Sequence, residues 1–166
     1  GPGAGPVGVG ERLLPYMPTP IVGKDTVDGV DQYRWLTEKD IPQTIGRLSA
    51  YMGNAGVLLR AYYYARVLGR EGMHRVGEFS TLNANYMMHR LKSTYTLPYD
   101  RTCMHEFVLE GVWKDLPGIH ALDIAKRLMD YKFHPPTNYF PLIVHEALMI
   151  EPTETESLDT LDAFCD

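Results

Sequence analysis

The sequence lacks the basic excess of a nucleic-acid-binding protein and the long apolar run of a membrane protein. Lys and Arg number 16 against 21 Asp and Glu, which gives a formal net charge of −5. Proteins that bind a phosphate backbone instead carry a basic surface. No apolar run approaches the roughly 18–20 residues that cross a bilayer. We therefore expect neither nucleic acid nor a membrane among the partners.

Cysteine is also scarce, and no secretory signal is recognisable. Cys103 and Cys165 are the only cysteines, which is too few for a disulfide framework and fits a reducing compartment. The first residues have neither the basic segment nor the apolar segment of a signal peptide. Together these absences predict a cytoplasmic protein.

Motifs for metal binding and nucleophilic catalysis are missing as well. The six histidines form no HExxH pattern, whereas a zinc site needs three or four converging nitrogen or sulfur ligands. There is no GxSxG motif, and Cys103 beside a predicted strand is expected to pack rather than react. We expect no metal site and no catalytic serine or cysteine.

What is present is a chain of 166 residues, 45% hydrophobic, which is enough for a folded core. Pro and Gly interrupt residues 1–45. Within them, residues 23–40 have mixed charge and little periodicity, so they are predicted to form an exposed connection. GPGAGP at residues 1–6 lacks the Lys-Ser/Thr of a P-loop, and we interpret it as an ordinary glycine loop.

Two helices are predicted in the middle of the chain. Residues 53–68 are apolar nearly all round, with Arg60 and Arg66 as the charged exceptions, a pattern typical of a helix buried between layers. Gly69 is a natural stop for this helix. Apolar side chains at spacings of three and four predict a second helix over residues 72–92.

The last third is predicted to be a small α/β unit. Its predicted elements are a strand at 104–109, a helix at 121–131, a strand at 147–150 and a helix at 157–166. The first of these helices is expected to turn four side chains inward: Leu122, Ala125, Leu128 and Met129.

The run EPTETES, residues 151–157, is rich in carboxylates and hydroxyls. Thr153 and Glu156 in this run fit a capping box. We therefore interpret the run as a strand exit followed by a helix cap rather than as a binding site.

Several long segments together resemble one family, the pyridoxal-phosphate (PLP) glycine decarboxylase, or P-protein, of the glycine cleavage system. The match is to its C-terminal part, as in subunit 2 of the two-subunit bacterial form. Strings such as FHPPT and MIEPTETES are specific to the family. The matching segments are 1–9, 45–69, 81–92, 97–109 and 121–166.

The resemblance implies a fold and a reaction. The fold would be the C-terminal part of an α/β, fold-type-I PLP-dependent transferase of the aspartate aminotransferase type. Residues 1–95 would form the end of its large domain and residues 96–166 its small α/β domain. The complete enzyme would decarboxylate glycine and pass the aminomethyl group to the lipoyl arm of H-protein. The implied partners are P-protein subunit 1, a second copy of the chain, lipoylated H-protein and glycine.

The family also implies that this chain carries no catalytic lysine. In the family the lysine that binds PLP lies in an HKTF-type segment just upstream of a glycine-rich run like that at residues 1–6. None of the six lysines here has that context: Lys24, Lys39, Lys92, Lys114, Lys126 and Lys132. We therefore expect the chain alone to be inactive and to bind no PLP.

Two regions are candidate parts of the site. Related folds bring the segment after the lysine loop to the phosphate of the dimer partner's cofactor, which suggests Gly53 and Asn54 at a helix N-terminus. The alternative is simple helix capping by Asn54. The loop FHPPTNYFP, residues 133–141, is the second region.

In that second region His134, Thr137 and Tyr139 are the residues expected to face the glycine carboxylate or the lipoyl arm. Two prolines would stiffen the loop, and a rigid surface connection is the alternative. Arg101 and His105, near a predicted strand, are further substrate-proximal candidates.

Two rival functions remain open at this point. One is a stand-alone α/β interaction module without catalysis. The other is a different aminotransferase-like PLP enzyme, which FHPPT and MIEPTETES fit poorly.

Overall fold

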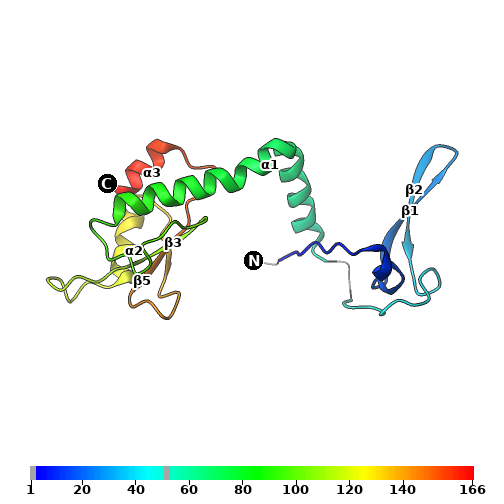
Figure 1. Cartoon of the computed structure of the whole chain (residues 1–166), viewed down its shortest axis with the longest axis horizontal. Coiled ribbons are helices and arrows are strands. Elements are labelled where there is room, and N and C mark those ends of the chain that lie inside the picture. The colour runs from blue at the N-terminus through cyan, green and yellow to red at the C-terminus, as the bar shows by residue number, and fades with distance from the viewer. Residues whose placement is uncertain (1–2, 51–52) are drawn as a thin grey trace. The chain divides into compact units, whose positions relative to one another are not determined.

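The computed structural model describes residues 3–50 and 53–166, and the chain divides into two compact units (Figure 1). The first unit is Gly1–Val67 and the second is Leu68–Asp166. The domain division at residues 95 and 96 concerns the complete enzyme and stays a prediction.

The first unit contains a β-hairpin where an irregular connection was predicted. A 3-10 helix, η1 (Glu11–Tyr16), precedes strands β1 (Ile21–Val27) and β2 (Val30–Leu36), which pair antiparallel. Asp28 and Gly29 join them with φ angles of 51° and 78°. Two positive φ angles are the requirement of the tight turn that suits a two-residue hairpin, and Asp-Gly is a preferred pair for it. The prediction for residues 23–40 was right about exposure and wrong about structure.

Helix α1 (Ala55–Leu91) joins both predicted helices and is interrupted at Gly69. The backbone of Gly69 has φ 63° and ψ −174°, a conformation that is essentially restricted to glycine. The predicted stop at Gly69 is therefore a break within α1. No helix in residues 3–50 or 53–166 is long and apolar enough to span a membrane.

The predicted burial of residues 53–68 is wrong for this chain. Leu59, Tyr63 and Val67 are 56%, 61% and 82% exposed. By contrast, the part of α1 after Gly69 buries five side chains: Asn83, Ala84, Met87, Met88 and Leu91.

The second unit is built on a three-stranded antiparallel sheet of order β3-β5-β4. Its strands are β3 (Phe107–Glu110), β4 (Thr137–Asn138) and β5 (Ala147–Ile150). The strand predicted at 147–150 is confirmed, whereas β3 begins three residues later than the predicted strand at 104–109. Met104, inside that prediction, is 77% exposed.

Helices α2 (Ala121–Asp130) and α3 (Leu158–Cys165) complete the core of this unit. Both confirm predicted helices, but only part of the predicted inward face of α2 is buried. Ala121 and Ala125 are buried, whereas Leu122 and Met129 are about half exposed, at 46% and 52%. Alanines at these two positions allow α2 to approach the core closely; Ala125 was predicted to face inward, whereas Ala121 was not.

Ser157, not Thr153, caps α3. Its hydroxyl accepts a hydrogen bond from the Thr160 N–H at 3.2 Å, which satisfies one of the unpaired donors of the first turn. Thr153 instead accepts the Glu156 N–H at its carbonyl in a turn. The predicted capping box is therefore wrong: the N-cap of α3 lies four residues after Thr153.

Candidate functional site

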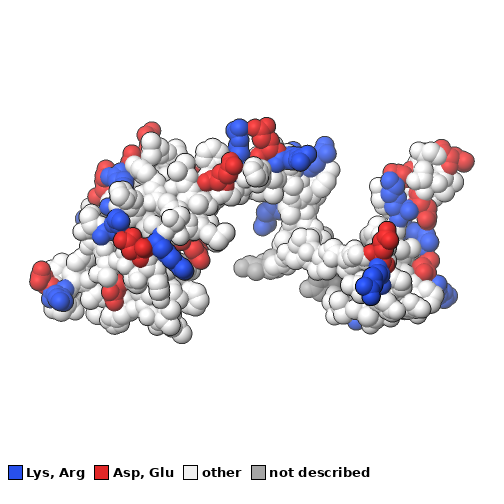
Figure 2. All heavy atoms as spheres, in the orientation of Figure 1, with Lys and Arg blue, Asp and Glu red and all other residues white. Residues whose placement is uncertain are grey.

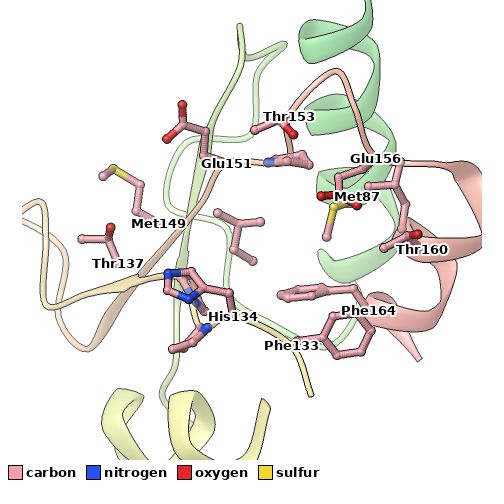
Figure 3. A pocket seen from close by; sticks show the side chains of 15 residues that line it. Met87, Phe133, His134, Thr137, Met149, Glu151, Thr153, Glu156, Thr160 and Phe164 are labelled. Atoms are coloured by element: carbon pink, nitrogen blue, oxygen red, sulfur yellow. The ribbon is translucent and has the colours of Figure 1, made fainter. Parts of the chain in front are cut away.

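A pocket of about 380 Å³ lies in the second unit, between the loop after α2, the end of β5 and one side of α3. Figure 3 shows His134 and Thr137 on the same side as Met149, with Glu151 and Thr153 above them. Pockets of this size hold small-molecule ligands in other proteins. Its lining combines apolar walls with a few polar groups, as such ligand sites do.

The loop after α2 places His134 in the pocket. The Phe133 N–H donates to the Leu128 carbonyl at 3.0 Å and thereby ties the loop to the end of the helix. Pro135 and Pro136 follow, and each fixes its own φ, so the direction of the chain toward Thr137 is set. His134 and Thr137, both predicted to be substrate-proximal, line the same pocket.

The run EPTETES forms the opposite edge. Glu151, Thr153 and Glu156 line the pocket, although the sequence led us to interpret this run as structural only. The side-chain amide of Asn83 donates to the Thr153 carbonyl at 2.9 Å and anchors the run to α1. Asn83 is 9% exposed, so this bond satisfies a nearly buried amide. The many carboxylates and hydroxyls of this run were the sequence feature that could have indicated a binding site.

None of the other predicted residues lines the pocket, although His105 lies close to Glu151, which does. The His105 Nε2 lies 3.7 Å from Oε1 of Glu151, and both side chains are about half exposed. Arg101 is exposed and outside the pocket lining. Tyr139 is also outside the lining; its N–H donates to the Ala147 carbonyl at 2.9 Å and closes the β4–β5 connection.

The walls of the pocket are aromatic and thioether side chains. Phe133 and Phe164 meet edge to face with ring centroids 5.3 Å apart. Met87 and Met149 line the pocket from α1 and β5, and thioethers pack well against irregular apolar groups. These apolar walls leave room for an apolar group beside the polar side chains of the pocket.

Titratable groups in the pocket can hold or move a proton. His134 offers an imidazole, and Glu151 and Glu156 offer carboxylates. A histidine can act as general acid or base near neutral pH. The threonine hydroxyls can hydrogen-bond an amine or a carboxylate. The arrangement therefore suits a small polar molecule with an apolar extension.

The two cysteines are packing residues in this structure. Both lie against the hydrophobic core, and burial raises the pKa of the Cys103 thiol and of the Cys165 thiol. A raised pKa disfavours the reactive thiolate. Within the described ranges, no group of three or more His, Cys, Asp or Glu side chains could hold a metal ion.

Gly53 and Asn54 lie at the start of α1, in the first unit. The Asn54 side-chain oxygen accepts the Val57 N–H at 3.2 Å, so Asn54 caps the helix. The N–H groups of Ala55 and Gly56 precede the first intrahelical donor at Leu58 and point along the positive end of the helix dipole. This donor set suits a phosphate such as that of PLP, and the phosphate role of Gly53 and Asn54 stays a prediction.

Comparisons with known proteins identify the family. Residues 76–166 match the family model "Glycine dehydrogenase, C-terminal domain". The chain is 60% identical over its full length to the probable glycine dehydrogenase (decarboxylating) subunit 2 of Thiobacillus denitrificans and covers 34% of that protein. It is also 60% identical over 99% of its length to the Nitrosomonas europaea protein of the same name, again covering 34%. The chain thus spans about a third of these relatives.

A solved structure shares the fold. It is the crystal structure of glycine decarboxylase (P-protein) of the glycine cleavage system in inhibitor-bound form. The TM-score is 0.68 at 18% identity, over 93% of this chain and 36% of that one. This likeness confirms the predicted fold: the chain shares the mixed α/β fold of part of that protein. With the family model covering more than half of its residues, the chain belongs to the glycine dehydrogenase C-terminal domain family.

Proposed function

We propose that this chain supplies the C-terminal part of a glycine dehydrogenase (decarboxylating) that needs further residues for activity. The complete enzyme releases carbon dioxide from glycine and transfers the aminomethyl group to the lipoyl arm of H-protein. The observation that carries this proposal is the pocket that His134, Thr137 and Glu151 line together, within the domain that defines the family. A stand-alone interaction module accounts for neither the family match nor this pocket.

In the complete enzyme, PLP supplies an electron sink for the bond that breaks. Gly53, Asn54 and the first N–H groups of α1 would hold the phosphate of the cofactor that the dimer partner carries. His134 and Thr137 bind and orient the glycine carboxylate or the incoming lipoyl arm, and the apolar walls keep water from the reacting atoms. Tyr139, Arg101 and His105 act from the rim of this region.

Further partners follow from the relatives. Their name, subunit 2, implies a companion subunit 1, and we extend this pairing to the present protein. A second copy of the chain, lipoylated H-protein and glycine complete the proposed set, and we place the enzyme in the cytoplasm. The chain alone has no decarboxylase activity and no absorbance band of lysine-bound PLP, because it has no lysine in the family's context.

Substitution of His134 tests the proposed pocket. In the complete enzyme, His134→Ala should lower kcat/KM for carbon dioxide release from glycine by about a hundredfold, because the substrate loses a group that orients it. His74→Ala is the matched control, since His74 lies on an exposed face of α1 with its side chain 80% exposed. Normal glycine turnover by the His134 variant removes this residue from the site.

Substitution of Asn54 separates phosphate binding from capping. Asp is as good an N-cap as Asn, so Asn54→Asp keeps the helix start while adding a negative charge beside a bound phosphate. We expect the complete enzyme to lose PLP faster on dialysis, measured by the cofactor's absorbance. Unchanged PLP retention would mean that Asn54 serves as a cap only.

A further inference from the structure

The first part of α1, residues 55–67, presents an unusually apolar surface to solvent. Leu58, Leu59, Tyr62, Tyr63 and Val67 are 48–82% exposed. In Figure 2 the visible side of this stretch is mostly uncharged. Monomeric soluble proteins rarely expose contiguous apolar patches of this kind unless they bind something.

This stretch also lacks the usual supports of a solvent-exposed helix. It contains no Asp or Glu, so Arg60 and Arg66 have no helical ion pair to stabilise the turns. Isolated helices shorter than about 12–15 residues are marginal in water, and most helices depend on packing of their apolar face. After Gly69, α1 has both an ion pair on its surface, Glu71 with Arg75 at 2.8 Å, and a packed apolar face that includes Met87 and Leu91.

The length of the relatives and the charge of the helix together indicate what covers this surface. About two thirds of each subunit 2 relative lies outside the part that this chain matches. A second copy of the chain is a poorer occupant, since a two-fold contact between these helices sets identical surfaces against each other. In such a contact the stretch offers Arg60 and Arg66 no acidic residue to pair with.

We propose that residues 58–67 form the contact surface for the remainder of the longer glycine dehydrogenase polypeptide. The partner surface is apolar, with carboxylates opposite Arg60 and Arg66. This proposal depends on the family membership of the chain and not on the proposed chemistry at His134. It also explains why a segment with the composition of a buried helix is exposed in the chain of 166 residues.

Cysteine labelling tests the proposal with little disturbance to folding. Val67→Cys, which is close in size, and Leu59→Cys are introduced into the chain of 166 residues and into the longer polypeptide that contains it. His74→Cys, on the charged face after Gly69, is the control. Each protein reacts with a water-soluble maleimide, and mass spectrometry of peptides separates the new thiols from Cys103 and Cys165.

We expect positions 59 and 67 to react readily in the chain alone and at least about tenfold more slowly in the longer polypeptide, as for a protected segment. Position 74 should react at similar rates in both. Equal labelling of 59 and 67 in the two contexts overturns the proposal. So does protection in the chain alone that grows with its concentration, because the occupant is then a second copy.

Discussion

The two parts of α1 on either side of Gly69 have the same secondary structure and opposite environments. Residues 55–67 are helical with exposed leucine and tyrosine side chains, whereas residues 70–91 bury Ala84, Met87 and Leu91 in the core of the second unit. The apolar content of a segment therefore indicates that it will be buried somewhere. It does not indicate whether the covering surface belongs to the same 166 residues.

The ties that hold the second part of α1 are visible in its polar contacts. The hydroxyl of Tyr86 donates to Asp162 of α3, and the Arg90 guanidinium pairs with the same carboxylate. These hydrogen bonds, that from Tyr86 above all, hold the pKa of Asp162 below its usual value. No such link to Arg60 or Arg66 occurs among the residues that the structure describes.

The largest expected difference in stability is between truncating a buried side chain in the second part of α1 and truncating an exposed one in the first part. Met87→Ala should lower the free energy of unfolding of the second unit by about 2–5 kcal/mol, because it leaves a cavity in the core. Met87 is 2% exposed, whereas Tyr63 is 61% exposed. Tyr63→Ala should change stability by no more than about 0.5 kcal/mol.

Urea unfolding measures this contrast, followed by fluorescence in a Trp35→Phe background. Trp113 is then the only tryptophan, and it belongs to the second unit, where its indole N–H donates to the Thr94 carbonyl at 3.0 Å. A large loss of stability with Tyr63→Ala in the isolated chain contradicts the comparison, since it means that the first part of α1 is already packed.

A smaller contrast concerns two glycines of α1. Gly69→Ala should destabilise the chain by about 1–3 kcal/mol, because its φ of 63° and ψ of −174° strain any residue with a Cβ. Gly77 is helical and a Cβ there meets nothing within 4 Å. Gly77→Ala should therefore stabilise by up to about 1 kcal/mol. The same unfolding assay distinguishes them, and a stabilising Gly69→Ala shows that the break at Gly69 is not required.

The smallest effect expected is a pH dependence that belongs to the second part of α1 alone. Because folding lowers the pKa of Asp162, its contribution to stability is present above the unfolded pKa of about 3.9 and is lost as pH falls through the folded value. Its partner Tyr86 has a raised pKa owing to the hydrogen bond to Asp162, so its contribution is lost as pH rises above about 10.

The free energies of unfolding of the parent and of Asp162→Asn should thus differ at neutral pH. The difference should narrow at both extremes of pH. Arg60→Gln serves as the control in the first part of α1, and the difference that it produces should not vary with pH. A gap between parent and Asp162→Asn that stays constant from about pH 3 to about pH 11, a range that spans the ordinary pKa values of both groups, contradicts the assigned pairing.

Local patterns predicted much of this fold. Helical periodicity located the second part of α1 and α2, and the continuous apolar run ALMI located β5. The hairpin was missed although Asp28-Gly29 between two valines is a hairpin signal, because the mixed charges on both strands hide the alternation. The inward face of α2 was predicted only in part: Ala125 is buried as expected, but only the packed core shows that Ala121, and not Leu122 or Met129, lies against it.

The candidate site also contains residues that the sequence predicted and residues that it did not. His134 and Thr137 were predicted from the family strings and lie together in the pocket. Glu151 was not chosen, because it enters the same pocket as His134 only through the antiparallel pairing of β4 with β5, which the sequence does not specify. Arg101 and Tyr139 also lie in segments that match the family, 97–109 and 121–166, but neither lines the pocket. Residue spacing alone does not specify which way these side chains point.

Amide hydrogen exchange over α1 tests the central claim most directly. In the chain of 166 residues, amides of residues 58–67 should exchange at least about tenfold faster than those of residues 83–91, because local stability follows local packing. In the longer glycine dehydrogenase polypeptide, the difference between the two segments should largely disappear. Equal protection of both segments in the isolated chain, or persistent rapid exchange of residues 58–67 in the longer polypeptide, would contradict the account.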